Sequence, residues 1–198
     1  ADSVEEPTAQ PARPDVLPVY APVSLPQGNP VDFYEARANP VLSDQLRRVV
    51  DGEGPLPEVL LFKRIARAWR LERTGSRISE RLRRLVPADI NRTREVEATF
   101  YWPTDADPRA WQQFRVAGNQ DESRRHASEV CAEEISAVIK HVLHLAGSAP
   151  RSELAKTVCK VFGMARTPAE AEARVNAVVD SMLQAGAVLE NEGYIRRP

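Results

Sequence analysis

Arginine and lysine recur at helical spacing in one part of the chain, where their side chains could hold phosphate groups. Between residues 57 and 94, eleven basic residues stand against four acidic ones, a net charge of +7. Arg77, Arg81 and Arg84 are spaced to share one face of a helix. Each arginine offers a planar fork that suits phosphate oxygens or a guanine edge. The candidate nucleic-acid contacts are Lys63, Arg67, Arg70, Arg73, Arg77, Arg81 and Arg84.

This positive charge is local. The whole 198-residue chain carries a net charge of −1, with −5 over residues 1–56, −4 over residues 95–149 and +1 over residues 150–198. The acidic residues nearest to the basic stripe are Glu72 and Glu80. Three interpretations remain open: contact with nucleic acid, docking of an acidic protein surface, and a solvated helix face with ion pairs between turns.

Residue patterns typical of enzymes are missing from the sequence. No glycine is followed by lysine, so the chain has no phosphate-binding loop for a nucleoside triphosphate. His141 and His144 share one side of a predicted helix, but no cysteine or carboxylate pair completes a metal site. Asp105 and Asp107 precede Pro108 and suit a turn. We therefore expect no catalytic residue, no metal and no cofactor.

The composition is that of a globular protein, with 42% hydrophobic and 28% charged residues. No apolar run approaches the roughly 20 residues that cross a bilayer, and no signal-peptide pattern opens the chain. Cys131 and Cys159 lack the spacing of a disulfide framework, which favours a reducing cytoplasm. Cys159 falls on the apolar side of a predicted helix and is expected to be buried.

A stretch of about sixty residues occurs twice in the chain. Residues 42–103 align without a gap with residues 135–196, at an offset of 93. Each copy is expected to be one folding unit. The two copies share twelve identical residues: Ser43/Ser136, Val49/Val142, Gly54/Gly147, Pro57/Pro150, Leu61/Leu154, Lys63/Lys156, Arg73/Arg166, Thr74/Thr167, Arg81/Arg174, Val86/Val179, Glu97/Glu190 and Tyr101/Tyr194.

The first copy predicts three helices followed by a hairpin. Apolar residues at helical spacing predict helices over 42–51 and 57–70, and a third helix begins at a cap formed by Thr74 or Ser76. Residues 95–103 have the β-branched and aromatic content of a strand.

The second copy repeats this order. Its first two helices are predicted around 135–143 and 154–162. Residues 167–170 read as a capping box that starts the third helix, and residues 187–196 read as a hairpin. Three helices closed by a hairpin is the order of a winged helix-turn-helix. The sequence therefore predicts a mainly α protein with small β hairpins (α+β), built as two tandem winged-helix-like units.

These patterns predict that the chain is divided into four segments. Residues 1–41 hold eight prolines and are expected to be a linker that becomes an extended strap from Val16 onward. Residues 42–103 form the first, basic unit, residues 104–132 form a polar connector, and residues 133–198 form the second unit.

Residues shared by the copies are expected to serve the fold, because the second copy is nearly neutral. Thr74 and Thr167 are expected to cap helices, and Tyr101 and Tyr194 to anchor the hairpins. Trp102 has no aromatic counterpart; it could stack on a base, but packing is favoured. The remaining expectation is that Arg81 and Arg174 pair with Glu97 or Glu190. If Arg81 is partly structural, Arg77 and Arg84 are the better probes of binding.

Several short phrases of the sequence resemble a known family. They are Glu53–Pro55, Lys63–Trp69, Arg73–Ile78, Phe100–Trp102, Ala132–Ile135 and Phe162–Thr167. From about Val16 to the C terminus, the chain resembles the C-terminal domain of unknown function of large bacterial superfamily-1-type helicases that also carry a Vsr-like endonuclease domain. One departure is Pro168 where the first copy has Gly75, which stiffens the second turn.

The resemblance implies a non-catalytic accessory module of a helicase–nuclease that acts on DNA in a defence or restriction-like role. Its expected partners are double- or single-stranded DNA and the other domains of the parent chain, with no membrane. We expect the first unit to contact the DNA backbone through its basic helices. The alternative is a protein-interaction or autoinhibitory module that docks on the parent helicase or nuclease domains.

Overall fold

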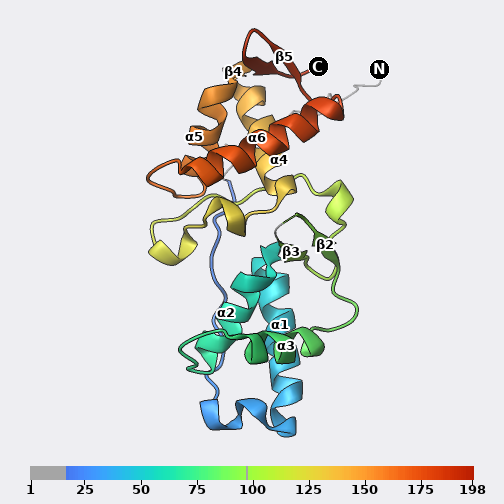
Figure 1. The fold of residues 1–198 in the computed structure, drawn as a ribbon, viewed down its shortest axis with the longest axis vertical. Helices are drawn as coiled ribbons and strands as arrows, with labels where there is room; N and C mark the ends of the chain where they lie inside the picture. Colours follow the sequence, from blue (N-terminus) through green and yellow to red (C-terminus); the bar gives the residue numbers. More distant parts are fainter. Residues whose placement is uncertain (1–16, 97) are drawn as a thin grey trace, which may run out of the picture.

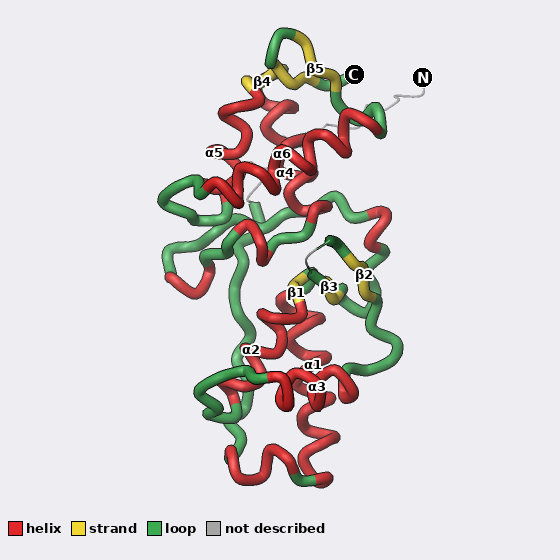
Figure 2. The backbone as a smooth tube through the Cα atoms, viewed as in Figure 1, coloured by secondary structure: helices red, strands yellow, loops and turns green. Residues whose placement is uncertain are grey.

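A computed structural model describes residues 17–96 and 98–198 of the chain (Figures 1 and 2). It contains helices and two small antiparallel sheets, so the fold class is α+β. The helices are α1 (Asn39–Glu53), α2 (Glu58–Ala68), α3 (Ser76–Leu85), α4 (Ala132–Ala146), α5 (Arg151–Val161) and α6 (Ala169–Gln184). The strands are β1 (Leu56–Pro57), β2 (Arg92–Arg94), β3 (Thr99–Tyr101), β4 (Ser148–Pro150), β5 (Leu189–Asn191) and β6 (Tyr194–Arg196). The 3-10 helices are Pro30–Tyr34, Ala36–Ala38, Pro108–Ala110, Asp121–Ser123 and Ala127–Glu129.

The same order of elements occurs twice. The first unit runs α1-β1-α2-α3-β2-β3 and the second α4-β4-α5-α6-β5-β6, and corresponding helices begin 93 residues apart. In each sheet the last strand lies in the middle, in the orders β1-β3-β2 and β4-β6-β5. The units lie one above the other in Figure 1, and each sheet is at the upper end of its unit.

The strands β1 and β4 were not expected from the sequence. Both are two or three residues long and end at a proline, Pro57 or Pro150, which cannot donate to a ladder. They are strands only because β3 and β6 pair with them, Leu56 opposite Tyr101 and Ala149 opposite Ile195.

Each unit has its own apolar core. Leu46, Leu61 and Leu82 from α1, α2 and α3 meet in the first, and residues at the same helical spacing meet in the second. Cys159 is buried, as expected from its place on the apolar side of α5. The sequence pattern thus predicted which helix faces turn inward.

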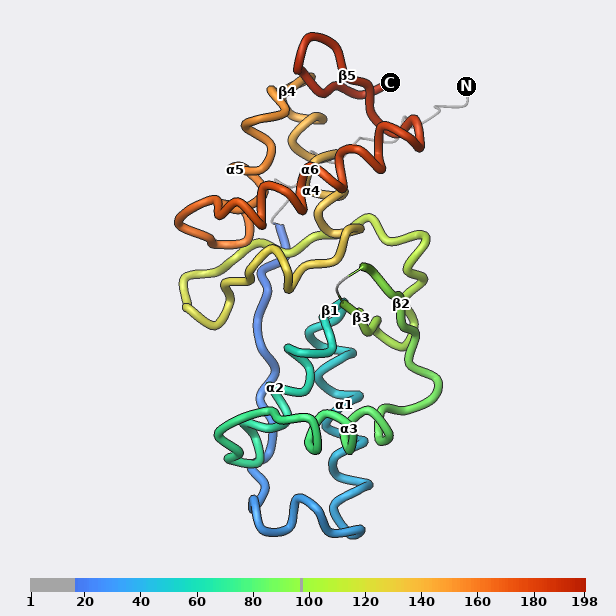
Figure 3. Tube along the Cα trace, viewed as in Figure 1, coloured from blue at the N-terminus to red at the C-terminus, as the bar shows by residue number. Residues whose placement is uncertain are grey.

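The described part of the proline-rich segment, residues 17–38, forms a strap along the first unit. Figure 3 shows it running from the junction of the two units to the lower end of the molecule. Tyr20 N donates to Val116 O at 2.9 Å, and Phe33 is fully buried edge-on to Trp69, with ring centroids 5.6 Å apart. The strap passes so close to Trp69 at Gly28 that a Cβ there would lie 2.3 Å from the indole ring. The strap is therefore part of the folded first unit.

The helix starts differ from the expectation. Gly75 is the N-cap of α3 and Pro168 that of α6, and neither helix has a side-chain cap bond. Thr74 and Thr167 are therefore not caps. The N-cap residues Gly75 and Pro168 both have an extended backbone. Each threonine lies one position before its N-cap residue and is therefore not in the capping position.

The hairpin of the second unit forms as predicted, but Tyr194 does not anchor it. Glu192 and Gly193 both have positive φ, at 50° and 78°, as a tight two-residue turn requires. Tyr194 is 51% exposed, whereas Ile195 is fully buried and occupies the place that Tyr101 has in the first sheet. A shift of one residue in a strand moves a side chain to the opposite face, so the ungapped alignment paired the wrong residues here.

Candidate nucleic-acid interface

The basic side chains of the first unit are positioned by α2, α3 and the turn between them. The apolar residues of α2, such as Leu61 and Ile65, face the core, which leaves Lys63 and Arg67 on the opposite, exposed side. Arg70, with φ at 56°, reverses the chain after α2. In α3 the inward side carries Leu82, so the charged side chains on the other side face solvent.

Six of the seven candidate side chains are exposed, and only Arg81 is half-buried. Lys63, Arg67, Arg73 and Arg84 make no side-chain hydrogen bond or ion pair to any residue in the described ranges 17–96 and 98–198. These four cations are therefore available to an outside anion. The other three lie against the strap.

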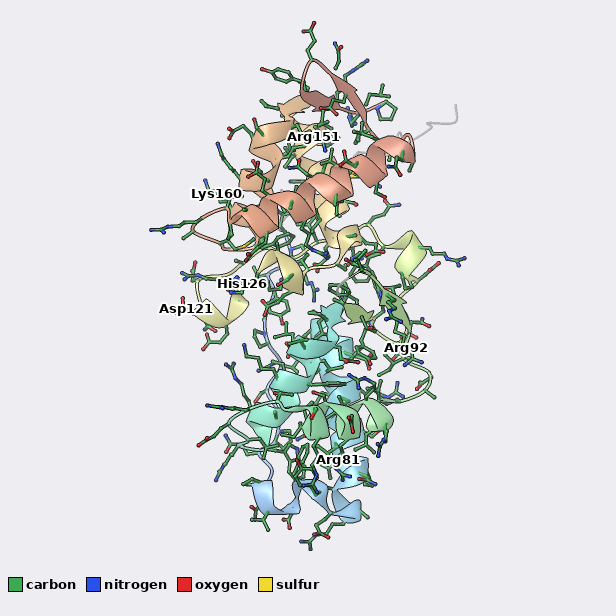
Figure 4. All side chains as sticks on the ribbon, in the orientation of Figure 1. Arg81, Arg92, Asp121, His126, Arg151 and Lys160 are labelled. Atoms are coloured by element: carbon green, nitrogen blue, oxygen red, sulfur yellow. The ribbon has the colours of Figure 1, made fainter. Side chains whose placement is uncertain are left out.

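Arg81 holds the strap instead of facing solvent. Its Nε donates to Phe33 O at 2.9 Å, and its Nη2 donates to Glu35 O at 3.0 Å and to Asn39 Oδ1 at 2.6 Å. Figure 4 shows Arg81 between α3 and the 3-10 helices at the lower end of the molecule. A guanidinium with three acceptors in the fold is a poor candidate for phosphate contact.

The predicted pairing of Arg174 with Glu190 is wrong. Arg174 Nη2 donates to Glu95 Oε2 at 2.7 Å and to Val130 O at 2.5 Å, while Glu190 accepts from Arg151 at 3.0 Å. The other predicted acceptor, Glu97, lies outside the described residues. Arg81 and Arg174 share a different role: each binds backbone carbonyls in the segment that precedes the first helix of its own unit.

Arg70 and Arg77 also contact the strap but remain exposed. Arg70 donates to Gln27 Oε1 from Nε at 3.0 Å and from Nη2 at 2.8 Å. The Arg77 guanidinium lies 4.3 Å from the centre of the Tyr34 ring. A guanidinium stacked on an aromatic ring keeps its outward edge for a further acceptor.

Two other arginines of the basic segment are committed to ion pairs. Arg64 binds the buried Glu53 at 2.8 Å and Val23 O at 2.6 Å. Arg83 binds Glu58, which also accepts from the Tyr101 hydroxyl at 3.0 Å. Each guanidinium thus already has a carboxylate partner within the fold.

Arg92 and Arg94 on β2 were not among the candidates from the sequence. Both are exposed and, in the part of the chain that the structure describes, make no side-chain hydrogen bond. Figure 4 shows Arg92 on the hairpin beside the first unit's helices. The sequence could have indicated that these two arginines lie together, because they are two residues apart on a strand and alternate strand residues share one face.

Burial and hydrogen bonding set the protonation states of Glu58 and Tyr101, which lie beneath this surface. Burial alone would raise the pKa of Glu58, but hydrogen bonds from Arg83 and Tyr101 outweigh it and hold the pKa below its ordinary value. Burial, followed by the charge of Glu58, raises the pKa of Tyr101 to about 12. Glu58 is thus a charged carboxylate and Tyr101 a neutral donor near neutral pH.

The remaining candidate side chains have structural surroundings. Trp102 is fully buried, with Nε1 donating to Thr93 Oγ1 at 2.9 Å, so the favoured packing role is confirmed. The Asp107 carboxylate accepts from Arg109 N at 2.9 Å, as a turn residue does. His141 lies against the Phe114 ring, 5.2 Å between centroids. Among the described residues, no group of three or more His, Cys, Asp and Glu could hold a metal ion.

Comparison with known proteins gives one family match. Residues 31–80 match a family model described as a protein of unknown function (DUF3320). The matched segment runs from the strap's 3-10 helices through α1, β1 and α2 into α3. No curated protein and no solved structure shows a significant match. In the described ranges, every helix is too short or too polar to cross a membrane.

Proposed function

We propose that this chain is a non-catalytic accessory module of two winged-helix-like units and that the first unit contacts the backbone of DNA. The order of elements and the central place of β3 in its sheet support this interpretation of the first unit. In such a unit α3 is the helix nearest to the groove, α2 crosses the backbone, and the β2–β3 hairpin is the wing.

The observation that carries the proposal is the set of exposed cations without partners. Lys63 and Arg67 on α2, Arg73 in the turn and Arg84 on α3 are available in the described structure, and Arg77 beside them keeps one edge free. Five such contacts give a salt dependence with a slope of about −4.5, at roughly −0.9 per phosphate.

We expect this unit to contact the phosphate backbone of DNA and not the edges of its bases. The strap occupies Arg81 and lies along one side of α3, which limits how far that helix can enter a groove. Phosphate contacts position a protein on DNA without reading its sequence. We therefore expect weak sequence preference.

The resemblance to helicase–nuclease proteins supports a place for this module beside helicase and Vsr-like nuclease domains in a bacterial defence or restriction-like system. In that setting the module would hold DNA for the catalytic domains, and the second unit would pack against the first unit or the parent protein.

One observation favours a second function, a protein-docking or autoinhibitory module. Arg70, Arg77 and Arg81 already hold a polypeptide segment, the strap, against α3. The same surface could receive an acidic segment of a helicase or nuclease domain.

The two functions are separated by measuring binding of duplex and single-stranded DNA at two salt concentrations by fluorescence anisotropy. We expect Arg73→Glu/Arg84→Glu to raise Kd at least tenfold and to reduce the salt slope by about 2. The matched control is Lys160→Glu/Arg166→Glu, which makes the same charge change on exposed residues of the second unit. Arg166 is the counterpart of Arg73, and Figure 4 shows Lys160 on α5. Equal losses in both variants, or no binding at low salt, would refute the DNA proposal, and capture of a helicase or nuclease domain would then favour docking.

A further inference from the structure

Two arginines of β2 face the same side of the first sheet as the basic helices. Thr93, between them, faces the other side, since its Oγ1 accepts from Nε1 of Trp102, which lies outside the core of the first unit. Alternate residues of a strand face opposite sides of a sheet. Arg92 and Arg94 therefore face the side of α2 and α3, and Arg92 pairs opposite the core residue Tyr101.

An ion pair divides the exposed cations on this side into two groups. Arg83 on α3 binds Glu58 at the start of α2, and Tyr101 on β3 donates to the same carboxylate, so the pair lies where the helices meet the sheet. Burial raises the pKa of Glu58, whereas hydrogen bonds from Arg83 and Tyr101 and the nearby charge of Arg92 lower it. The group on the helices and their turn is Lys63, Arg67, Arg73 and Arg84. The group on β2 is Arg92 and Arg94, and Figure 4 shows Arg92 on the hairpin, well apart from Arg81 on α3.

The first unit offers no free aromatic ring beside these cations, as far as residues 17–96 and 98–103 are described. Every phenylalanine and tryptophan in these ranges is buried, and so are Tyr20 and Tyr101. Tyr34 is 40% exposed, but the Arg77 guanidinium lies 4.3 Å from the centre of its ring and Phe33 packs edge-on against it. Proteins that hold single strands without sequence preference stack successive bases on aromatic side chains. This surface has cations for a nucleic acid but no such stacking platform in the described ranges.

Carboxylates beside β2 restrict where a polyanion can lie. A hollow between β2 and the connector is lined by Arg92 and Arg109, but also by the exposed Asp105 and Asp107. These two carboxylates offset the charge of Arg109 and repel phosphate groups. The surface that attracts a phosphate backbone is therefore on the helix side of β2.

We propose that the DNA held by the first unit is double-stranded, with one backbone along α2 and α3 and the other against Arg92 and Arg94 of β2. This inference rests on the proposed function and names its substrate. The two backbones of a duplex flank a groove, so two separated groups of cations can each meet a row of phosphates, whereas a single strand offers one row. Two further phosphate contacts steepen the salt dependence by about 1.8, at roughly −0.9 per contact.

The test is fluorescence anisotropy with one oligonucleotide, alone and annealed to its complement, over a series of salt concentrations. We expect the parent chain to bind the duplex about tenfold more tightly than the single strand. Arg92→Gln/Arg94→Gln removes both charges without reversing them. It should reduce the salt slope for the duplex by about 1.8 and leave the Kd for the single strand within about twofold of the parent value. Arg92→Lys/Arg94→Lys keeps both charges and should bind the duplex like the parent.

The matched control is Arg109→Gln/Arg124→Gln, which removes two exposed arginines from the connector and should change neither affinity. All four substituted residues are exposed, and unchanged thermal unfolding of each variant verifies its fold. Equal affinity of the parent chain for the two forms of DNA overturns the inference, as does an equal loss for both forms in the β2 variant. If Arg73→Glu/Arg84→Glu weakens binding but the β2 variant does not, DNA binding stands and the role of β2 is refuted. A parent chain that binds neither form refutes the proposed function itself.

Discussion

Arginine serves three purposes in the basic segment, and its neighbours decide which. Arg64 and Arg83 neutralise glutamates, Arg81 binds the strap's carbonyls, and Arg73 and Arg84 face solvent. All five have the same side chain and lie within 21 positions of the sequence. A count of charge in the sequence therefore overstates the number of cations that a ligand can reach.

Replacing Arg81 by alanine should destabilise the protein, because it leaves the acceptors on Phe33, Glu35 and Asn39 without their donor. Hydrogen bonds to a charged group contribute about 1.5–3 kcal/mol each, so we expect a loss of at least about 2 kcal/mol in the free energy of unfolding. Urea unfolding measures it. Arg84→Ala, which removes an exposed arginine from the same helix, should change stability by less than about 0.5 kcal/mol. Equal losses in the two variants would show that Arg81 does not hold the strap.

Among the elements, Glu58 joins three parts of the first unit. It begins α2, binds Arg83 on α3, and accepts from Tyr101 on β3 at 3.0 Å. The contact holds the sheet against the helix pair at the position where β1 continues into α2. A single carboxylate thus connects α2 and α3 to the β2–β3 hairpin.

This contact predicts a pH dependence. The pKa of Glu58 is lower in the folded chain than its ordinary value of 4.5, so its contribution to stability is present above that value and is lost as the pH falls through the folded pKa. In urea unfolding, Glu58→Gln should be less stable than the parent at pH 7, and the difference should shrink below about pH 4.5. Glu72→Gln, at an exposed position between α2 and α3, should show no such convergence. A constant difference across this range would contradict the prediction.

For the whole molecule, a buried cluster of charges joins the two units. Glu53 ends α1 and Glu134 lies in the first turn of α4, and both are fully buried. Arg115 donates to Glu134 at 3.0 Å and to Glu53 O at 2.5 Å, so one connector side chain binds both units. Arg125 binds Glu134 at 2.6 Å, and Tyr20 of the strap donates to Glu53 at 2.8 Å. The connector and the strap are therefore structural links between the units.

Glu134→Ala should uncouple the units, because it leaves Arg115 and Arg125 largely buried without their carboxylate. Breaking one partner of a buried pair costs about 3–5 kcal/mol. We expect calorimetry to show two unfolding transitions where the parent chain shows one. Glu153→Ala removes an exposed glutamate paired with Lys156 and should leave a single transition. A single transition for Glu134→Ala at the parent temperature would contradict the coupling.

Much of the secondary structure was predictable from the sequence, because local rules determine it. Apolar residues at helical spacing, such as Leu61 and Ile65, placed the helices and their buried faces. Gly193 marked the tight turn of the second hairpin. The repeat at an offset of 93 predicted that the elements would occur twice in one order.

Only the tertiary structure decided where charged side chains go. Glu53 and Glu134 are charged residues, yet both are buried, because Arg64 on α2 and Arg115 in the connector reach them. Tyr194 aligned with Tyr101, yet strand pairing moved it to the outer face. Helix formation depends on neighbours three or four residues away. The partner of an arginine depends on how separate elements pack, as for Arg81 and Asn39, 42 residues apart, or Arg174 and Glu95, 79 residues apart, and spacing in the sequence does not record this packing.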